Sequence, residues 1–130
     1  MKKAAVMIML AVFVLLTGCG QNESQAASYT QITQEEAMRM MEKDDGHVIV
    51  DVRRQDEFDA GHIPGAILIP NENIIDSPPI ELPDFDQVIL IYCRSGNRSK
   101  QASQKLADMG YRNVYEFGGI NTWQGEITTE

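Results

Sequence analysis

Residues 88–99 read VILIYCRSGNRS, and the architecture expected for the chain follows from this stretch. Its first five residues are apolar and do not alternate with polar ones, which is typical of a strand buried on both faces of a parallel sheet. Cys93 follows at the carboxyl end of this strand, where open α/β sheets place their binding crevices. After a short loop, residues 99–109 have the composition of a helix that ends before Gly110.

The loop after Cys93 combines the parts of an anion-binding cradle. It contains a glycine and two arginines, Arg94 and Arg98. Backbone N–H groups of such a loop can point inward, and the N-terminus of the following helix adds partial positive charge. A cysteine held there is expected to be largely thiolate at neutral pH.

The charge distribution favours the same interpretation. The chain has 19 acidic and 11 basic residues, yet residues 87–107 contain four basic residues and no acidic one. A positive segment in an acidic chain indicates an anionic substrate or a stabilised thiolate. A buried structural cysteine beside a solvated basic helix is the alternative. The glycine, the two arginines and the strand–loop–helix order favour a chemical role for Cys93.

Residues 1–18 are predicted to be a lipoprotein signal peptide. Two lysines precede thirteen apolar residues at 4–16, fewer than the roughly 20 that span a membrane. Residues 16–19 (Leu-Thr-Gly-Cys) resemble the bacterial lipobox, in which Cys19 receives lipid and becomes the first mature residue. An ordinary secretory peptide cut at another position is the alternative. We expect the protein to be lipid-anchored in the cell membrane, on its extracytoplasmic face.

Processing at Cys19 would change the charge and the cysteine count. Removal of two lysines leaves nine basic residues against 19 acidic ones, a net charge of −10. This charge argues against nucleic acid, and against anionic lipid, as a partner of the folded surface. Cys93 would have no intramolecular disulfide partner. An unpaired thiol in an exported protein is exposed to oxidation, so its presence favours a chemical function.

The mature chain is expected to hold one folded domain at residues 29–127. A lipidated, flexible tether at 19–28 precedes it and a frayed tail at 128–130 follows. The expected elements, in order, are strands at 29–32, 47–52, 67–69, 88–92 and 113–117, helices after Thr33, at 55–59 and at 99–109, and a short helix near 72–75 within the irregular connection 70–86. Thr33 and Glu36 have capping-box spacing.

Two polar residues outside the loop, Asp51 and His62, are expected to have structural roles. Asp51 lies near the end of a buried strand, and a carboxylate there requires a partner. Arg53, Arg54 or a loop arginine can supply it, so we interpret Asp51 as structural support for the site rather than as a catalytic group. His62 lies between glycine and proline, which favours a hydrogen bond that fixes a turn over a general-base role.

Several motifs together resemble the single-domain rhodaneses over about residues 29–127. The matching motifs are Asp51-Val52-Arg53, Glu57-Phe58, GHIPGA at 61–66, CRSGNRS at 93–99 and VYEFGG at 114–119 with Trp123. The resemblance implies an α/β, rhodanese-like fold with a five-stranded, mainly parallel sheet flanked by helices on both faces. It also implies a sulfurtransferase whose cysteine takes a sulfane sulfur from a donor, becomes a persulfide and passes the sulfur to an acceptor.

The resemblance also implies roles for particular residues. Cys93 resembles the nucleophile, and Asp51 and Arg53 are taken as site support. The substrate-binding loop would comprise Arg94, Ser95, Gly96, Asn97, Arg98 and Ser99. The second loop arginine either binds the anion or braces the loop.

The expected partners are a small anionic sulfur donor such as thiosulfate and an acceptor that is cyanide, a thiol or an acceptor protein. No cofactor and no metal are expected. The tandem-domain thiosulfate and mercaptopyruvate enzymes differ from this chain in domain number, so their substrate choice is not transferred to it.

Two other classes of function remain open at this point. One is a noncatalytic persulfide carrier or redox-sensing module. The other is a cysteine phosphatase or arsenate reductase. Tyrosine-phosphatase signatures have five residues between cysteine and arginine, whereas four separate Cys93 from Arg98. The shorter loop favours a single sulfur atom over a phosphoryl group with three equatorial oxygens.

Overall fold

The computed structural model describes residues 27–130. The predicted signal peptide, the lipidation site at Cys19 and most of the predicted tether lie outside these residues. Within them, no helix is long and apolar enough to cross a membrane.

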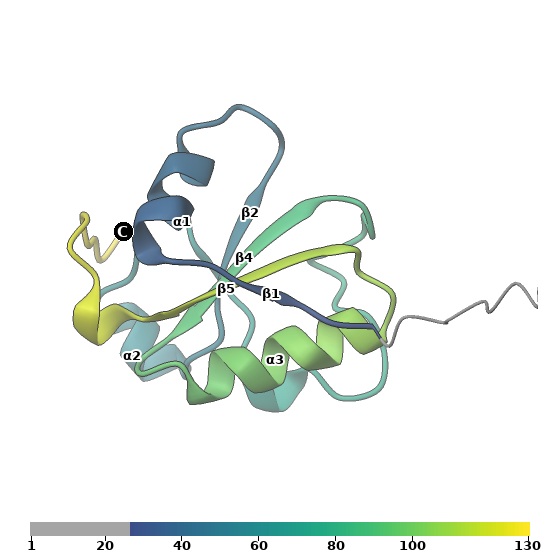
Figure 1. Ribbon diagram of the computed structural model, residues 1–130. Coiled ribbons are helices and arrows are strands. Elements are labelled where there is room, and N and C mark those ends of the chain that lie inside the picture. Colours follow the sequence, from purple (N-terminus) through teal and green to yellow (C-terminus); the bar gives the residue numbers. More distant parts are fainter. Residues whose placement is uncertain (1–26) are drawn as a thin grey trace, which may run out of the picture.

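Five strands form one sheet, in which every strand pairing is parallel (Figure 1). The strand order is β1-β5-β4-β2-β3, with β4 in the centre. The strands are β1 Thr30–Gln31, β2 Val48–Asp51, β3 Ile67–Leu68, β4 Val88–Cys93 and β5 Asn113–Gly119. The predicted five-stranded, mainly parallel α/β sheet is confirmed.

Residues 27–130 also contain three α-helices and two short 3-10 helices, of which η2 follows the last strand. They are α1 Gln34–Met41, α2 Gln55–Ala60, α3 Asn97–Asp108, η1 Asn71–Asn73 and η2 Ile120–Thr122. Helix α1 starts with the predicted capping box, because the Thr33 hydroxyl accepts from the Glu36 N–H while the Glu36 carboxylate accepts from the Thr33 N–H. Helix α3 ends before Gly110, whose φ of +107° only glycine adopts easily.

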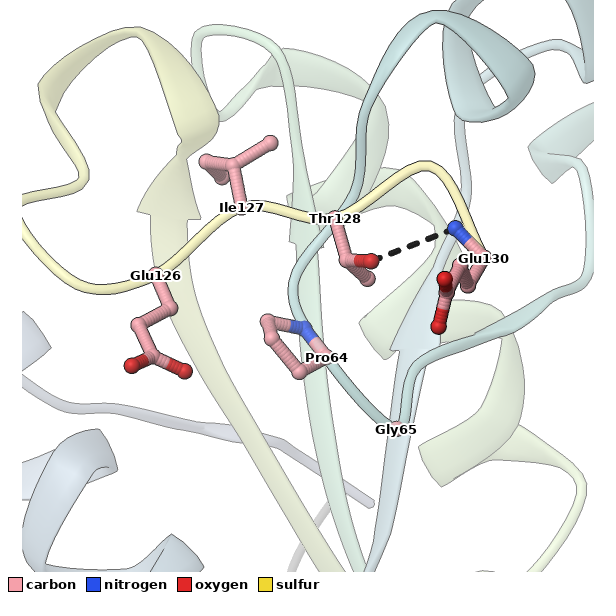
Figure 2. A pocket seen from close by; sticks show the side chains of 6 residues that line it. All are labelled: Pro64, Gly65, Glu126, Ile127, Thr128 and Glu130. Carbon is pink, nitrogen blue, oxygen red and sulfur yellow. Dashed lines mark hydrogen bonds between the residues drawn. The ribbon is translucent and has the colours of Figure 1, made fainter.

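Most boundaries differ from the expectation by one or two residues, and two of the differences affect the site and the C-terminus. Helix α3 begins at Asn97, two residues early, because Gly96 takes a φ of +105° and turns the chain directly into the helix. At the C-terminus, Thr128 is not frayed: it exchanges two backbone hydrogen bonds of 2.8 Å with His62. The Thr128 hydroxyl also accepts from the Glu130 N–H (Figure 2). The histidine ring lies between the carbonyl oxygens of Phe58 and Glu130.

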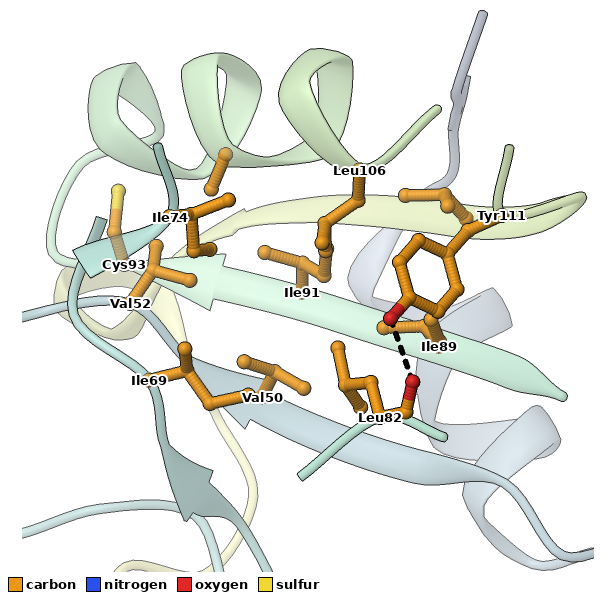
Figure 3. Close-up of a cluster of buried hydrophobic side chains, with 12 residues drawn as sticks. Val50, Val52, Ile69, Ile74, Leu82, Ile89, Ile91, Cys93, Leu106 and Tyr111 are labelled. Atoms are coloured by element: carbon orange, nitrogen blue, oxygen red, sulfur yellow. Dashed lines mark hydrogen bonds between the residues drawn. The ribbon is translucent and has the colours of Figure 1, made fainter. Parts of the chain in front are cut away.

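The central strand divides the core into two clusters. Ile89, Ile91 and Cys93 belong to the cluster beneath α3, whereas Leu90 and Tyr92 belong to the cluster that includes residues of α1 and packs against α2. Figure 3 shows the first cluster, with the cysteine side chain at the carboxyl end of β4 and on the side covered by α3. The alternation therefore places the sulfur under the start of that helix.

Candidate active site

The candidate nucleophile is buried at the point where β4 passes into the loop. Cys93 is 1% exposed. Its Sγ accepts a hydrogen bond from the Gly96 N–H at 3.0 Å and lies 3.3 Å from the Ser99 Oγ. The N-terminus of α3 follows directly after Gly96, and the first N–H groups of a helix have no hydrogen-bond partners within it. The sulfur therefore lies where backbone donors and the helix dipole favour negative charge.

Close approach of two backbones fixes the position of this loop. A Cβ placed on Gly119 of β5 would lie 2.0 Å from the carbonyl oxygen of Arg94, a distance no real side chain tolerates. That carbonyl also accepts from the Asn121 N–H at 3.2 Å. Absence of a side chain at residue 119 is therefore what allows β5 and the loop to pack together.

The two loop arginines have different environments. Arg98 donates to both carboxylate oxygens of Glu57 in α2, at 2.7 and 3.0 Å. These hydrogen bonds raise the pKa of Arg98 and lower the pKa of Glu57 to about 2. Arg94 is exposed and has no ion pair within residues 27–130. In the structure, Arg98 braces α3 against α2, and Arg94 is the arginine whose charge is available.

On the β2 side of the central strand, Asp51 and Arg53 form a buried ion pair. Two nitrogens of Arg53 donate to the Asp51 carboxylate at 2.7–3.0 Å, and one also donates to the Gly61 carbonyl. Burial opposes the arginine's charge, but the bonds to Asp51 raise its pKa above the ordinary value. The Tyr92 hydroxyl donates to the same carboxylate at 2.7 Å and accepts from the Ile63 N–H. Asp51 therefore holds the strand ends together without touching Cys93.

On the β5 side lies a residue that the sequence analysis missed. Glu116 is 2% exposed, and its Oε1 accepts from the Ser99 hydroxyl at 2.7 Å and from the Gly118 N–H at 2.8 Å. Its other oxygen accepts from the Gln31 side chain at 3.2 Å. Like Asp51, Glu116 is a carboxylate inside a predicted buried strand, and this pattern is the signal by which the sequence could have identified it.

The remaining loop residues differ in exposure. Ser95 and Asn97 are exposed at the surface, whereas Gly96 is buried beside the sulfur. A groove of about 330 Å³ lies beside the loop, and Ser95, Gly96 and Glu116 are among its lining residues. A hollow of about 660 Å³ lies between residues 64–65 and the C-terminal segment (Figure 2). Because it contains none of the predicted site residues, we place the chemistry at the loop.

Residues 27–130 contain no cluster of three histidine, cysteine, aspartate or glutamate side chains that could hold a metal ion. The site consists of a thiol, backbone donors, one available guanidinium and a buried carboxylate. This set suits nucleophilic sulfur chemistry on an anion.

Comparison with known proteins gives consistent matches. The model of the rhodanese-like domain matches residues 33–126. The thiosulfate sulfurtransferase GlpE of Pseudomonas fluorescens is 35% identical over 105 residues, which are 80% of this chain and 93% of GlpE. The adenylyltransferase and sulfurtransferase UBA4 of Meyerozyma guilliermondii is 36% identical over 89 residues, 62% of this chain but only 21% of UBA4.

Two solved structures illustrate the similarity in fold. A rhodanese-like domain protein from Staphylococcus aureus has a TM-score of 0.67 at 29% identity, covering 78% of this chain and 98% of its own. A rhodanese from E. coli solved with anions has a TM-score of 0.59 at 28% identity, covering 65% of this chain and 99% of its own.

Proposed function

The chain belongs to the rhodanese-like domain family, and from that membership we propose that it transfers a sulfane sulfur through a persulfide on Cys93. The donor is an anion such as thiosulfate, and the acceptor is cyanide or a thiol. One observation carries the proposal: the buried Cys93 sulfur accepts the Gly96 N–H at 3.0 Å, at the start of α3. A thiolate there is stabilised as a nucleophile.

The proposed transfer has two steps. In the first, the Cys93 thiolate attacks the sulfane sulfur of thiosulfate; an S–S bond forms, the bond to SO₃ breaks, and sulfite leaves with the bonding electron pair. The negative charge is then on the outer persulfide sulfur. In the second, cyanide or a thiolate attacks that outer sulfur, and the electron pair of the S–S bond returns to Cys93 as thiolate. No cofactor is required.

The environment of Arg94 supports an anionic donor. Its guanidinium is exposed, whereas Arg98 is occupied by Glu57. We propose that Arg94 attracts the donor and stabilises its departing charge, while Arg98 keeps the loop in shape. GlpE, the relative with the more complete coverage, is named a thiosulfate sulfurtransferase.

Phosphatase chemistry is less well supported. Four residues separate Cys93 from Arg98, and that arginine is paired to a carboxylate rather than available for a phosphoryl group. Glu57 is held by that arginine, and Glu116 is buried beneath Ser99. Neither is placed to protonate a leaving group, as a phosphatase requires.

The test is the intact mass of the purified chain after incubation with thiosulfate and removal of the excess. The wild-type protein should gain the mass of one sulfur atom and lose it to cyanide, while Cys93→Ser should do neither. Arg94→Ala should lower kcat/KM for thiosulfate by about tenfold. Lys43→Ala, which removes an exposed charge after α1, is the matched control. Sulfur retained by Cys93→Ser, or phosphatase activity without sulfur transfer, would overturn the proposal.

We also propose that a lipid on Cys19 anchors the domain at the extracytoplasmic face of the cell membrane. The lipobox-like residues 16–19 and the apolar run before them support this proposal. Cys19→Ser should move the protein from the membrane fraction or leave an unprocessed precursor. Wild-type protein found in the soluble fraction without detergent would contradict it.

A further inference from the structure

We propose that Glu116 and Cys93 share a single proton through the Ser99 hydroxyl, so that Glu116 sets the pH range in which the cysteine can attack a donor. This inference rests on the proposed sulfur transfer and adds a positioning residue to it. It concerns three side chains from three segments: the end of β4, the first turn of α3 and the middle of β5.

The three groups form a continuous path inside the protein. The Ser99 Oγ lies 3.3 Å from the Cys93 Sγ and 2.7 Å from the Glu116 Oε1. The cysteine is 1% exposed, the serine 0% and the glutamate 2%. Because all three side chains are buried, the serine hydroxyl is the side-chain group to which the sulfur can pass a proton. Hydrogen bonds between buried groups are also stronger than those in water.

The hydroxyl has one proton and several acceptors around it. The shortest bond is to Glu116, and the others are to the carbonyls of Gly96 at 3.0 Å and Gly118 at 3.4 Å. When Glu116 is ionised, the charged acceptor takes the hydroxyl proton. The serine oxygen then faces the sulfur as an acceptor, which favours the S–H form of Cys93.

When Glu116 is protonated, the direction of the path reverses. The carboxylic acid donates to the Ser99 oxygen, and the serine donates its own proton to a Cys93 thiolate. The path therefore has two arrangements with the same number of protons: thiol with carboxylate, or thiolate with carboxylic acid. Conversion breaks the S–H bond, leaves its electron pair on sulfur, passes that proton to Ser99 Oγ and passes the serine proton to Glu116.

The partners of Glu116 permit this exchange. Besides Ser99, the carboxylate accepts from the Gly118 N–H and the Gln31 amide, both of which are neutral donors. No arginine or lysine forms an ion pair with it within residues 27–130. A carboxylate paired with a buried cation would lose its ion pair when it took up a proton. Glu116 has no ion pair to lose.

Other charged groups lie around the path. They are Arg94 in the loop, Lys100 and the Arg98–Glu57 pair at the start of α3, and the Asp51–Arg53 pair on β2. The carboxylates of both pairs are held by arginines, and the remaining groups are basic. The proposed exchange therefore involves Cys93 and Glu116 and leaves both ion pairs intact.

The proposal predicts a coupled titration. With Glu116 ionised, forming the thiolate would bring a second negative charge onto the path, and like charges disfavour one another. Replacing Glu116 by Gln removes that charge and frees the serine proton for the sulfur. The Cys93 thiolate should then form at lower pH in Glu116→Gln than in the wild type.

The experiment measures single-turnover persulfide formation from thiosulfate, and alkylation of Cys93 by iodoacetamide, against pH. In Glu116→Gln the midpoint of both profiles should move down by about one pH unit or more. The high-pH rate should remain near that of the wild type. Damage to the fold alone would lower the rate at every pH without moving the midpoint. Glu126→Gln, at an exposed position, is the matched control and should leave both profiles unchanged.

A second variant tests the path itself. In a Ser99→Ala background, where the bridging hydroxyl is absent, Glu116→Gln should shift the midpoint by clearly less than it does in the wild type. Profiles of Glu116→Gln that superimpose on the wild type would overturn the shared proton. A wild-type protein that forms no persulfide would instead overturn the proposed function, and the alkylation profile would still test the proton sharing.

If Glu116→Gln does not fold, the wild-type protein supplies the test. The carboxyl ¹³C shift of Glu116 should titrate over a different pH range in the wild type than in Cys93→Ala, where the path ends at the serine. Identical titration curves in these two proteins would overturn the proposal.

Discussion

The two strands that flank β4 each have one buried carboxylate, and the two are held in different ways. Asp51 of β2 is fastened to the Arg53 guanidinium and to the Tyr92 hydroxyl. Glu116 of β5 accepts only from neutral donors, the Ser99 hydroxyl among them. An ion pair fixes the charge of a carboxylate, whereas neutral donors hold its position and leave its proton exchangeable. We infer that the β2 side supports the site and the β5 side takes part in its chemistry.

The same difference extends beyond the two carboxylates. On the β2 side, α2 is tied to the start of α3 by the Glu57–Arg98 ion pair. On the β5 side, the loop and the strand are in direct backbone contact at Gly119. The β2 side is held together by ion pairs and the β5 side by close backbone packing. Three mutational tests distinguish these two kinds of constraint.

The largest expected effect comes from neutralising each carboxylate with its isosteric amide. Asp51→Asn leaves Arg53 buried with an uncompensated charge, which should lower the free energy of unfolding by about 3–5 kcal/mol. Glu116→Gln leaves no buried cation without a partner and should lower the free energy of unfolding by about 1 kcal/mol. Urea unfolding of both variants at neutral pH measures the difference. Equal losses would show that the two carboxylates are held alike.

An intermediate effect is expected from Gly119→Ala. The added Cβ meets the Arg94 carbonyl, so β5 or the loop must move, at a cost of about 1–3 kcal/mol. Displacement of the loop should also slow persulfide formation. Gly46→Ala is the control, because its added Cβ meets no atom within 4 Å and only its positive φ is strained. Thermal unfolding and sulfur loading that match in these two variants would exclude close packing as the constraint.

The smallest effect should be that of Glu57→Gln, and it should depend on pH. The pKa of Glu57 is lowered from 4.5 to about 2, chiefly by its hydrogen bonds to Arg98. This carboxylate therefore contributes stability above pH 4.5, and the contribution is lost as pH falls from 4.5 toward 2. Because the pair is partly exposed, we expect about 1 kcal/mol. The difference in unfolding free energy between wild type and Glu57→Gln should be present at pH 6 and vanish near pH 2; a constant difference would contradict this origin.

The elements of the fold could be predicted because their signals are local. The apolar run before Cys93, the capping box at Thr33 and the glycine after α3 each act over a few residues. Helix α3 starts two residues earlier than the sequence predicts, because its start depends on the conformation that Gly96 takes in the folded loop. The predicted fraying at 128–130 is contradicted by the bridge between His62 and Thr128, two segments far apart in the chain.

Local patterns were sufficient to predict a parallel α/β sheet with a cysteine at the end of its central strand, because strand periodicity and helix caps depend on neighbouring residues. Which charged groups meet depends instead on contacts between distant segments. Arg98 pairs with Glu57, which lies 41 residues earlier in the chain, and Ser99 of α3 forms a hydrogen bond with Glu116 of β5. Both outcomes depend on how α2, α3 and β5 converge on one loop. The assignment of Arg98 as a brace, and the proposal that Glu116 acts on Cys93 through Ser99, both depend on that convergence.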